Sequence, residues 1–186
     1  MKRLINILPW LIVAALIFKY WVDSQPTTIS IQAPLEQVST TDYTDFLPTY
    51  TVVNGSVYDG DTIRVTDGKT EIKIRFACVD APERSQPGGI EARDELRKIL
   101  SSDRNQVKVD AITTDRYGRT VAELWNGQGL VQSQLAGAGL VYPYEQYKSD
   151  CKNWDAVKRA SEFAIANKLG VWANPNAVKP WDYRKK

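Results

Sequence analysis

The sequence contains no histidine among its 186 residues. This absence excludes a Ser-His-Asp or Cys-His triad, a histidine-liganded zinc or iron site and a histidine general base. Cysteine is nearly absent too: Cys78 and Cys151 are far apart and form no CxxC pair, which excludes a cysteine-rich zinc site or an iron–sulfur cluster. Catalysis would therefore rest on carboxylates, Arg, Lys, Tyr, Ser or Thr, together with a hard, oxygen-liganded cation such as Ca²⁺ or Mg²⁺.

The chain also lacks a strong charge of either sign. Its net charge is +2, and the segment 49–173 carries 17 basic and 17 acidic residues. A field of that size does not attract an anionic partner over the whole domain. Binding to nucleic acid would instead require arginines gathered at one place, because phosphate contacts supply most of the affinity.

Residues 1–23 have the pattern of a membrane-targeting segment. Lys2 and Arg3 precede the nearly apolar run 4–22, whose 19 residues would span roughly 28 Å as a helix, close to the thickness of a bilayer core. The pattern fits a signal anchor, or a signal peptide cleaved near Ser24, and the aromatic pair Tyr20-Trp21 favours the anchor. Either reading places the rest of the chain outside the cytoplasm: on the extracytoplasmic face of the membrane, or secreted or periplasmic after cleavage.

Beyond this segment, the composition predicts a tethered domain. Residues 24–48 are rich in Ser, Thr, Gln, Pro and Asp, as in a flexible linker, and residues 174–186 form a basic tail. Between them, alternating or apolar runs predict strands and 3.6-residue periodicity predicts helices. The strands are expected at 50–53, 62–66, 71–79, 106–112 and 120–125, hairpin turns at Asp59-Gly60 and Asp67-Gly68, and helices near 92–100, 130–138 and 152–168. This order favours an α+β fold: a five-stranded OB-fold β-barrel with three packed α-helices, preceded by an N-terminal hydrophobic helix.

Carboxylates and arginines follow the predicted strand ends. Asp61 follows an Asp-Gly turn, Asp80 and Glu83 flank an Ala-Pro exit, and Arg75 and Arg119 supply guanidinium groups. Taken singly, each motif is an ordinary turn, loop or surface arginine. Together they match what metal-assisted attack on a phosphodiester needs: carboxylates for a hard cation, one carboxylate for the attacking water and arginines for the phosphoryl oxygens.

These motifs, in this order and spacing, resemble those of the staphylococcal nuclease-like (thermonuclease) family. The resemblance covers residues 49–173 and rests on four segments: Asp59–Thr62, Arg75–Glu83, Asp115–Arg119 and Leu169–Trp172. It implies an OB-fold enzyme that hydrolyses DNA and RNA with Ca²⁺ and leaves 3′-phosphates. Together with the N-terminal segment 1–23, the resemblance leads us to expect an exported, membrane-anchored endonuclease.

The resemblance also assigns roles to individual residues. Asp61, Asp80 and the carbonyl of Ala81 match the Ca²⁺ ligands of the family. Glu83 matches its general base or water-positioning residue, and Arg75 and Arg119 match its phosphate clamps. The positions that match its contacts to nucleotide phosphate and base are Arg116, Tyr117, Tyr142 and Tyr144.

Two other functions stay open from the sequence. A non-catalytic nucleic-acid-binding module on the same barrel would lack some of the acids or arginines, and all five are present. A protein-docking barrel would need an exposed apolar surface, for which the sequence gives no sign. No protein partner can be inferred, and we expect a monomer.

The positions of Arg75 and Asp80 conflict with their assignment to one site. Residues five apart on a regular strand point to opposite faces of the sheet, so the strand must twist or end before Asp80 if the two side chains are to meet.

The two cysteines have two interpretations. Cys78 shares a strand face with Ile72, Ile74 and Phe76 and is expected in the core. Cys151 would lie on the buried side of the last helix if that helix begins by Ser149 or Asp150. A disulfide between them suits an oxidising compartment, while two reduced, buried cysteines are the alternative.

Overall fold

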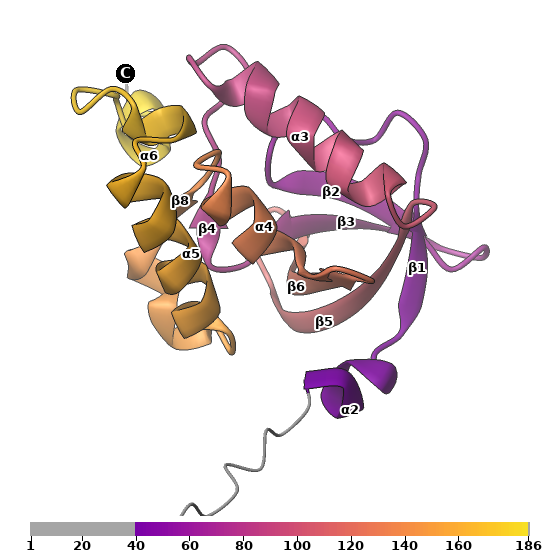
Figure 1. Ribbon diagram of the computed structural model, residues 1–186. Coiled ribbons are helices and arrows are strands. Elements are labelled where there is room, and N and C mark those ends of the chain that lie inside the picture. The colour runs from indigo at the N-terminus through magenta and orange to yellow at the C-terminus, as the bar shows by residue number, and fades with distance from the viewer. Residues whose placement is uncertain (1–39, 186) are drawn as a thin grey trace, which may run out of the picture. The chain divides into compact units, whose positions relative to one another are not determined.

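A computed structural model describes residues 40–185 (Figure 1). Its secondary structure follows the predicted order of strands and helices. The strands are β1 (Thr49–Val52), β2 (Thr62–Thr66), β3 (Glu71–Phe76), β4 (Val79–Asp80), β5 (Gln106–Thr114), β6 (Thr120–Asn126), β7 (Gly129–Leu130) and β8 (Tyr142–Pro143). The helices are α2 (Thr40–Asp45), α3 (Gly89–Ser101), α4 (Val131–Gly137), α5 (Trp154–Ala166) and α6 (Pro180–Tyr183), with 3₁₀ helices at Glu145–Asp150 and Gly170–Trp172.

The strands close into a five-stranded barrel. The sheet has the order β3-β2-β1-β5-β6-β7, and a parallel pairing of β3 with β6 joins its two sides. In β2 the side chains of Ile63 and Val65 are fully buried while Arg64 between them is exposed, as a strand with one face on the core requires. The α+β barrel predicted from the sequence is confirmed.

Three longer helices pack on the barrel. The apolar faces of α3 and α4 add Leu96, Leu100 and Leu135 to the core, all nearly or fully buried. Helix α3 packs against α4, and Figure 1 shows α5 lying on the side of β4 and β8. These helices leave the loops around β4 at one edge of the barrel, where the predicted site residues lie.

The N-terminal predictions fall largely outside the described residues. The hydrophobic segment 1–23 and the linker up to residue 39 lie there, and within residues 40–185 no helix has the length and apolar character to cross a bilayer. The last part of the predicted linker differs from the expectation, because residues 40–45 form α2. Tyr43 of α2 donates a hydrogen bond to buried Asp110, whose carboxylate also binds Lys152 Nζ at 2.7 Å.

Two local predictions were wrong. Asp59-Gly60 does not form a tight hairpin: β1 pairs with β2 through Val52 and Val65, which leaves a nine-residue loop in which Asp59 and Gly60 lie. The last long helix begins at Trp154, so Cys151 precedes it in extended conformation instead of lying on its buried face. In the first place the Asp59 side chain accepts from the local backbone and favours a turn. Before α5, Asn153 instead donates to buried Glu123 through its backbone and side-chain N–H groups.

Candidate active site

A break between β3 and β4 brings Arg75 and Asp80 together. The predicted continuous strand 71–79 ends at Phe76, and Cys78 adopts a left-handed conformation with φ of 70° before β4 begins. The chain therefore turns, and Arg75 Nη2 lies 2.6 Å from Asp80 Oδ1. Arg75 Nη1 also donates to the carbonyls of Phe76 and Val79, which fixes the guanidinium across the break. The alternation that would separate the two side chains is lost at Cys78.

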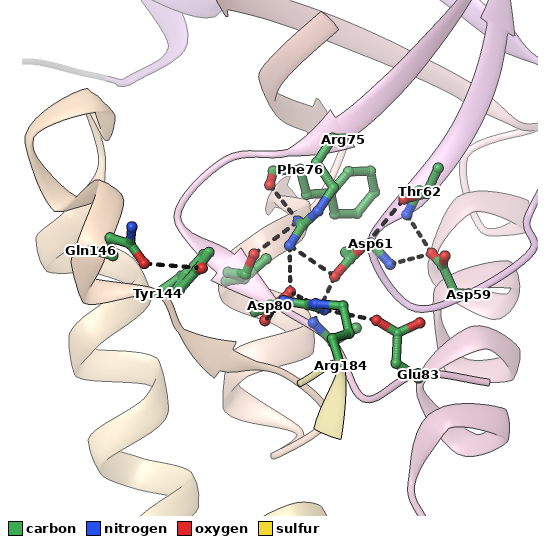
Figure 2. A network of polar contacts seen from close by, with 12 residues as sticks. Asp59, Asp61, Thr62, Arg75, Phe76, Asp80, Glu83, Tyr144, Gln146 and Arg184 are labelled. Atoms are coloured by element: carbon green, nitrogen blue, oxygen red, sulfur yellow. Dashed lines mark hydrogen bonds and ion pairs between the residues drawn. The ribbon is translucent and has the colours of Figure 1, made fainter. Parts of the chain in front are cut away.

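Asp61 lies at the end of the β1–β2 loop and faces the same guanidinium. Its Oδ2 accepts a hydrogen bond of 2.6 Å from the backbone N–H of Ala81 and lies 3.3 Å from Arg75 Nη2. Its Oδ1 accepts from the Thr62 hydroxyl at 3.2 Å. The contact with Ala81 joins the β1–β2 loop to the residue after β4, so Asp61 and Asp80 belong to one site (Figure 2).

Asp59 adds a third carboxylate to this region. It accepts hydrogen bonds from the backbone N–H groups of Asp61 and Thr62, at 3.1 and 2.7 Å, and so shapes the turn that carries Asp61. Burial, with the nearby charge of Asp61, raises the pKa of Asp59 to about 6. Sequence reasoning placed Asp59 in a motif and gave it no role in the site.

Asp80 is the most buried of these acids. Its side chain has no exposed surface, and β4 holds it by pairing Asp80 with Tyr142 of β8. Burial raises the pKa of Asp80, while the guanidinium groups of Arg184 and Arg75 act in the opposite direction. Because burial disfavours the charged form, the ionised Asp80 depends on a cationic neighbour, either an arginine or a metal ion.

Glu83 lies beyond Pro82 at the edge of this cluster, with 36% of its side chain exposed. Its partner is Arg184 of the C-terminal tail, whose Nη1 lies 2.7 Å from Glu83 Oε1. The same guanidinium reaches Asp80, with Nη2 2.6 Å from Oδ2 (Figure 2). Sequence reasoning missed Arg184, because the tail was taken as a basic extension; the aromatic residues Trp181 and Tyr183 just before it were the available signal for packing.

Arg119 stands apart from this cluster. Its backbone N–H and Nε donate to the two oxygens of Asp115, at 2.9 and 2.7 Å. Burial works against ionisation of Asp115, but these bonds prevail and hold its pKa below the usual range. Strands β3 and β6 pair in parallel with Arg75 opposite Val121, so these two side chains point to the same face of the sheet. Arg119 lies two residues before Val121, and strand alternation would place it on that face too. Within residues 40–185 no direct contact joins Arg119 to Asp80 or Glu83.

The four predicted substrate contacts separate into two places. Arg116 and Tyr117 lie on the exposed Asp115–Arg119 turn, with Arg116 Cζ 4.8 Å from the centre of the Tyr117 ring. Tyr144 is half-buried near Asp80, while Tyr142 is 1% exposed. The ring of Tyr142 packs edge-on against Trp172, with centroids 5.0 Å apart. Aromatic neighbours cover the Tyr142 ring in this arrangement, and its role as a substrate contact stays a prediction.

A disulfide borders the site. Cys78 and Cys151 are joined, with their Cα atoms 5.5 Å apart. Buried Glu123 lies beside it and accepts hydrogen bonds from the backbone and side-chain N–H groups of Asn153. The bond therefore connects the β3–β4 break, two residues before Asp80, to the start of α5.

The acids of the site bear on whether a metal ion can bind there. Within the part of the chain that the structure describes, no group of three or more His, Cys, Asp or Glu side chains is arranged to hold one. Asp61 and Asp80 nevertheless present two carboxylates to one guanidinium, and the backbone N–H of Ala81 donates to Asp61. Hard oxygen donors of this kind suit Ca²⁺, which completes a shell of 6–8 oxygens with carbonyls and water. By the chemistry of their donor atoms, the carboxylates of Asp61 and Asp80 therefore suit such an ion.

Comparisons with known proteins place the chain in a family. Residues 73–174 match the family model described as "Staphylococcal nuclease homologue". A micrococcal nuclease of Shigella flexneri is 31% identical over 140 residues, covering 69% of this chain and 77% of the relative. A thermonuclease of Staphylococcus hyicus is 35% identical over 133 residues, covering 68% and 76%. An uncharacterized endonuclease of Escherichia coli is 32% identical over 129 residues, covering 69% and 80%. The chain belongs to the staphylococcal nuclease family.

Proposed function

We propose that this chain is a Ca²⁺-dependent endonuclease that hydrolyses the phosphodiester bonds of both DNA and RNA and leaves 3′-phosphates. The observation that carries the proposal is the cluster of Arg75 with Asp61 and Asp80, 3.3 and 2.6 Å from its Nη2. Family membership and the nuclease names of the relatives support the reaction class.

Asp61, Asp80 and the carbonyl of Ala81 would hold the Ca²⁺. When bound, the ion supplies a positive charge that neutralises a phosphate oxygen and orients water. The neighbouring Asp59 supports this role indirectly, because its hydrogen bonds to the backbone of Asp61 and Thr62 set the direction of the Asp61 carboxylate. A carboxylate held in place loses less conformational entropy when it binds an ion.

Glu83 is the candidate for positioning or deprotonating the attacking water. It is the acid of the cluster that reaches solvent, with its side chain 36% exposed against none for Asp80. A general base needs access to water, and a carboxylate accepts the proton through a direct hydrogen bond. In this structure Arg184 occupies Glu83 Oε1, so a proton from water would go to Oε2, or to Oε1 once that contact has opened.

Arg75 and Arg119 would stabilise the charge that develops on the phosphoryl oxygens. Guanidinium forks bind phosphate through two parallel hydrogen bonds, and this contact strengthens as the transition state gains charge. Both arginines are held by carboxylates, Arg75 by Asp80 and Arg119 by Asp115, which keeps them extended and limits the rotamers lost on binding.

Tolerance of both sugar types would follow from the aromatic contacts. Tyr117 is 68% exposed on its turn and lies under Arg116 and Arg119, so a base can stack there beside two cationic groups. Stacking and phosphate contacts discriminate weakly between sequences and sugars. Digestion of DNA and RNA in Ca²⁺, arrest by a chelator and analysis of the product ends test the whole proposal: 5′-phosphate ends would contradict the assigned cleavage.

We further propose that the domain acts outside the cytoplasm, with the segment 1–23 as a membrane anchor. The basis is the basic start followed by an apolar run. We expect membrane fractions to contain the full chain, and external protease to release a fragment cut upstream of Thr40, where α2 begins. Soluble extracellular protein whose N-terminus is Gln25 would show that the segment is a cleaved signal, and protection from external protease would contradict the placement.

A further inference from the structure

The C-terminal tail folds back over the candidate active site. Residues 178–185, here called the C-terminal strap, contain α6, which Pro180 starts by fixing the first helical position. The Val178 carbonyl accepts a hydrogen bond from Gln86, and the Tyr183 and Ser85 hydroxyls lie 3.2 Å apart. Gln86 is buried and lies in the loop after Glu83, so the strap is fixed to the loop that carries this acid.

Arg184, near the end of the strap, forms ion pairs with the acids Asp80 and Glu83. Its Nη2 lies 2.6 Å from Asp80 Oδ2, and its Nη1 lies 3.3 Å from Asp80 Oδ1 and 2.7 Å from Glu83 Oε1. With Arg75 on Oδ1, both oxygens of Asp80 are committed to guanidinium groups. The backbone supports this position, because the N–H of Arg184 donates to the carbonyl of Pro180.

The strap covers the aromatic side of the site as well. The ring of Trp181 stacks on Tyr144, with centroids 5.4 Å apart and planes inclined by 6°. Lys179 Nζ lies 3.9 Å from the centre of the Tyr142 ring, and burial lowers the pKa of this lysine. Both tyrosines that would meet a nucleotide beside Asp80 are therefore in contact with the strap.

We infer that the strap is an intramolecular competitor, in which Arg184 holds Asp80 and Glu83 until Ca²⁺ takes its place. This inference rests on the proposed function. Arg184 occupies Asp80 Oδ2, the oxygen that Arg75 leaves open. A guanidinium and a divalent ion that share this oxygen repel each other. The apparent Kd for Ca²⁺ is then the intrinsic Kd divided by the fraction of molecules in which Arg184 has left Asp80.

The competition predicts a tighter Ca²⁺ site when Arg184 is removed. Ca²⁺ is titrated calorimetrically, without nucleic acid, into the full chain in detergent micelles and into its Arg184→Gln variant. The Kd is expected to fall about tenfold in the variant. Lys185→Gln is the matched control: it removes the same charge from the next residue, whose 73% exposed side chain pairs with Asp182 and not with Asp80. Its Kd is expected to stay within about twofold of the original.

A second readout follows the strap directly. The backbone N–H groups of Tyr183 and Arg184 bond to the carbonyls of Lys179 and Pro180. If Ca²⁺ displaces the strap, hydrogen exchange in a peptide covering 178–186 should become faster on adding Ca²⁺. An unchanged or weaker Kd in Arg184→Gln, or unchanged exchange in a chain that binds Ca²⁺, would overturn the competition and leave the nuclease proposal standing. Absence of Ca²⁺ binding in all three chains would overturn both.

Discussion

Glu83→Gln is expected to lower kcat at least about 100-fold while the chain stays folded. The amide keeps the size of Glu83 but does not accept a proton, so the loss falls on the transition state and amounts to roughly 2.7 kcal/mol or more. The side chain is partly exposed, and within residues 40–185 its partner is Arg184 alone, so the fold should not depend on its charge. Single-turnover cleavage of plasmid DNA in saturating Ca²⁺ measures the effect.

Arg119→Ala is expected to give a loss of similar size for a different reason, the missing neutralisation of a phosphoryl oxygen. The Asp115 turn should survive, because Asp115 Oδ1 still accepts from the backbone N–H groups of Tyr117 and Arg119. Glu91→Gln and Arg159→Ala, at exposed positions of α3 and α5, serve as controls with the same changes of charge. Cleavage at the original rate by both Glu83→Gln and Arg119→Ala would contradict the assigned roles.

Removing the disulfide is expected to cost roughly 4 kcal/mol of folding free energy. The bond between Cys78 and Cys151 closes a loop of about 74 residues, and in the chain-entropy model the unfolded state gains that much when such a loop opens. Buried Glu123 would keep its two hydrogen bonds from Asn153, so the double variant Cys78→Ala/Cys151→Ala should leave no new unpaired charge. Urea unfolding of the full chain gives the value.

A reducing agent provides the internal control for this experiment. It should lower the urea midpoint of the original chain to that of the double variant and leave the double variant unchanged. Because Cys78 lies two residues before Asp80, reduction should also weaken catalysis. An original chain whose midpoint is the same in oxidising and reducing buffer would show that the bond contributes no stability.

The sequence predicted the barrel because its strands have a clear alternation. Ile63 and Val65 are buried on either side of exposed Arg64, as the pattern indicated. The sequence did not predict that β3 ends at Phe76, because the alternation of apolar and polar residues from Ile72 onward is typical of a single strand that continues to Val79. The left-handed conformation of Cys78 ends β3 there, and no local preference of cysteine announces it. That single residue decides whether Arg75 and Asp80 meet.

The sequence predicted those residues of the site that lie in short, continuous motifs. Asp61, Asp80 and Glu83 lie in short segments with recognisable turns, so their spacing could be read directly. Arg184 lies 104 residues beyond Asp80, and a contact over that separation depends on how α5 and α6 pack. The same reason explains α2, whose Tyr43 meets Asp110 across 67 residues. Long-range contacts of single polar residues leave little trace in one sequence read alone.

The measurement that tests the central claim most directly is the Ca²⁺ dependence of plasmid cleavage by the full chain and by Asp61→Asn. Asp61 is fixed by the backbone of Ala81 and faces Arg75, so the amide keeps the shape and removes one anionic ligand. We expect loss of intact plasmid in Ca²⁺ and full protection by a chelator. For Asp61→Asn we expect both a lower maximal rate and a half-saturating Ca²⁺ concentration at least about tenfold higher. Cleavage that persists in the chelator, or identical Ca²⁺ curves for the two chains, would contradict the central claim.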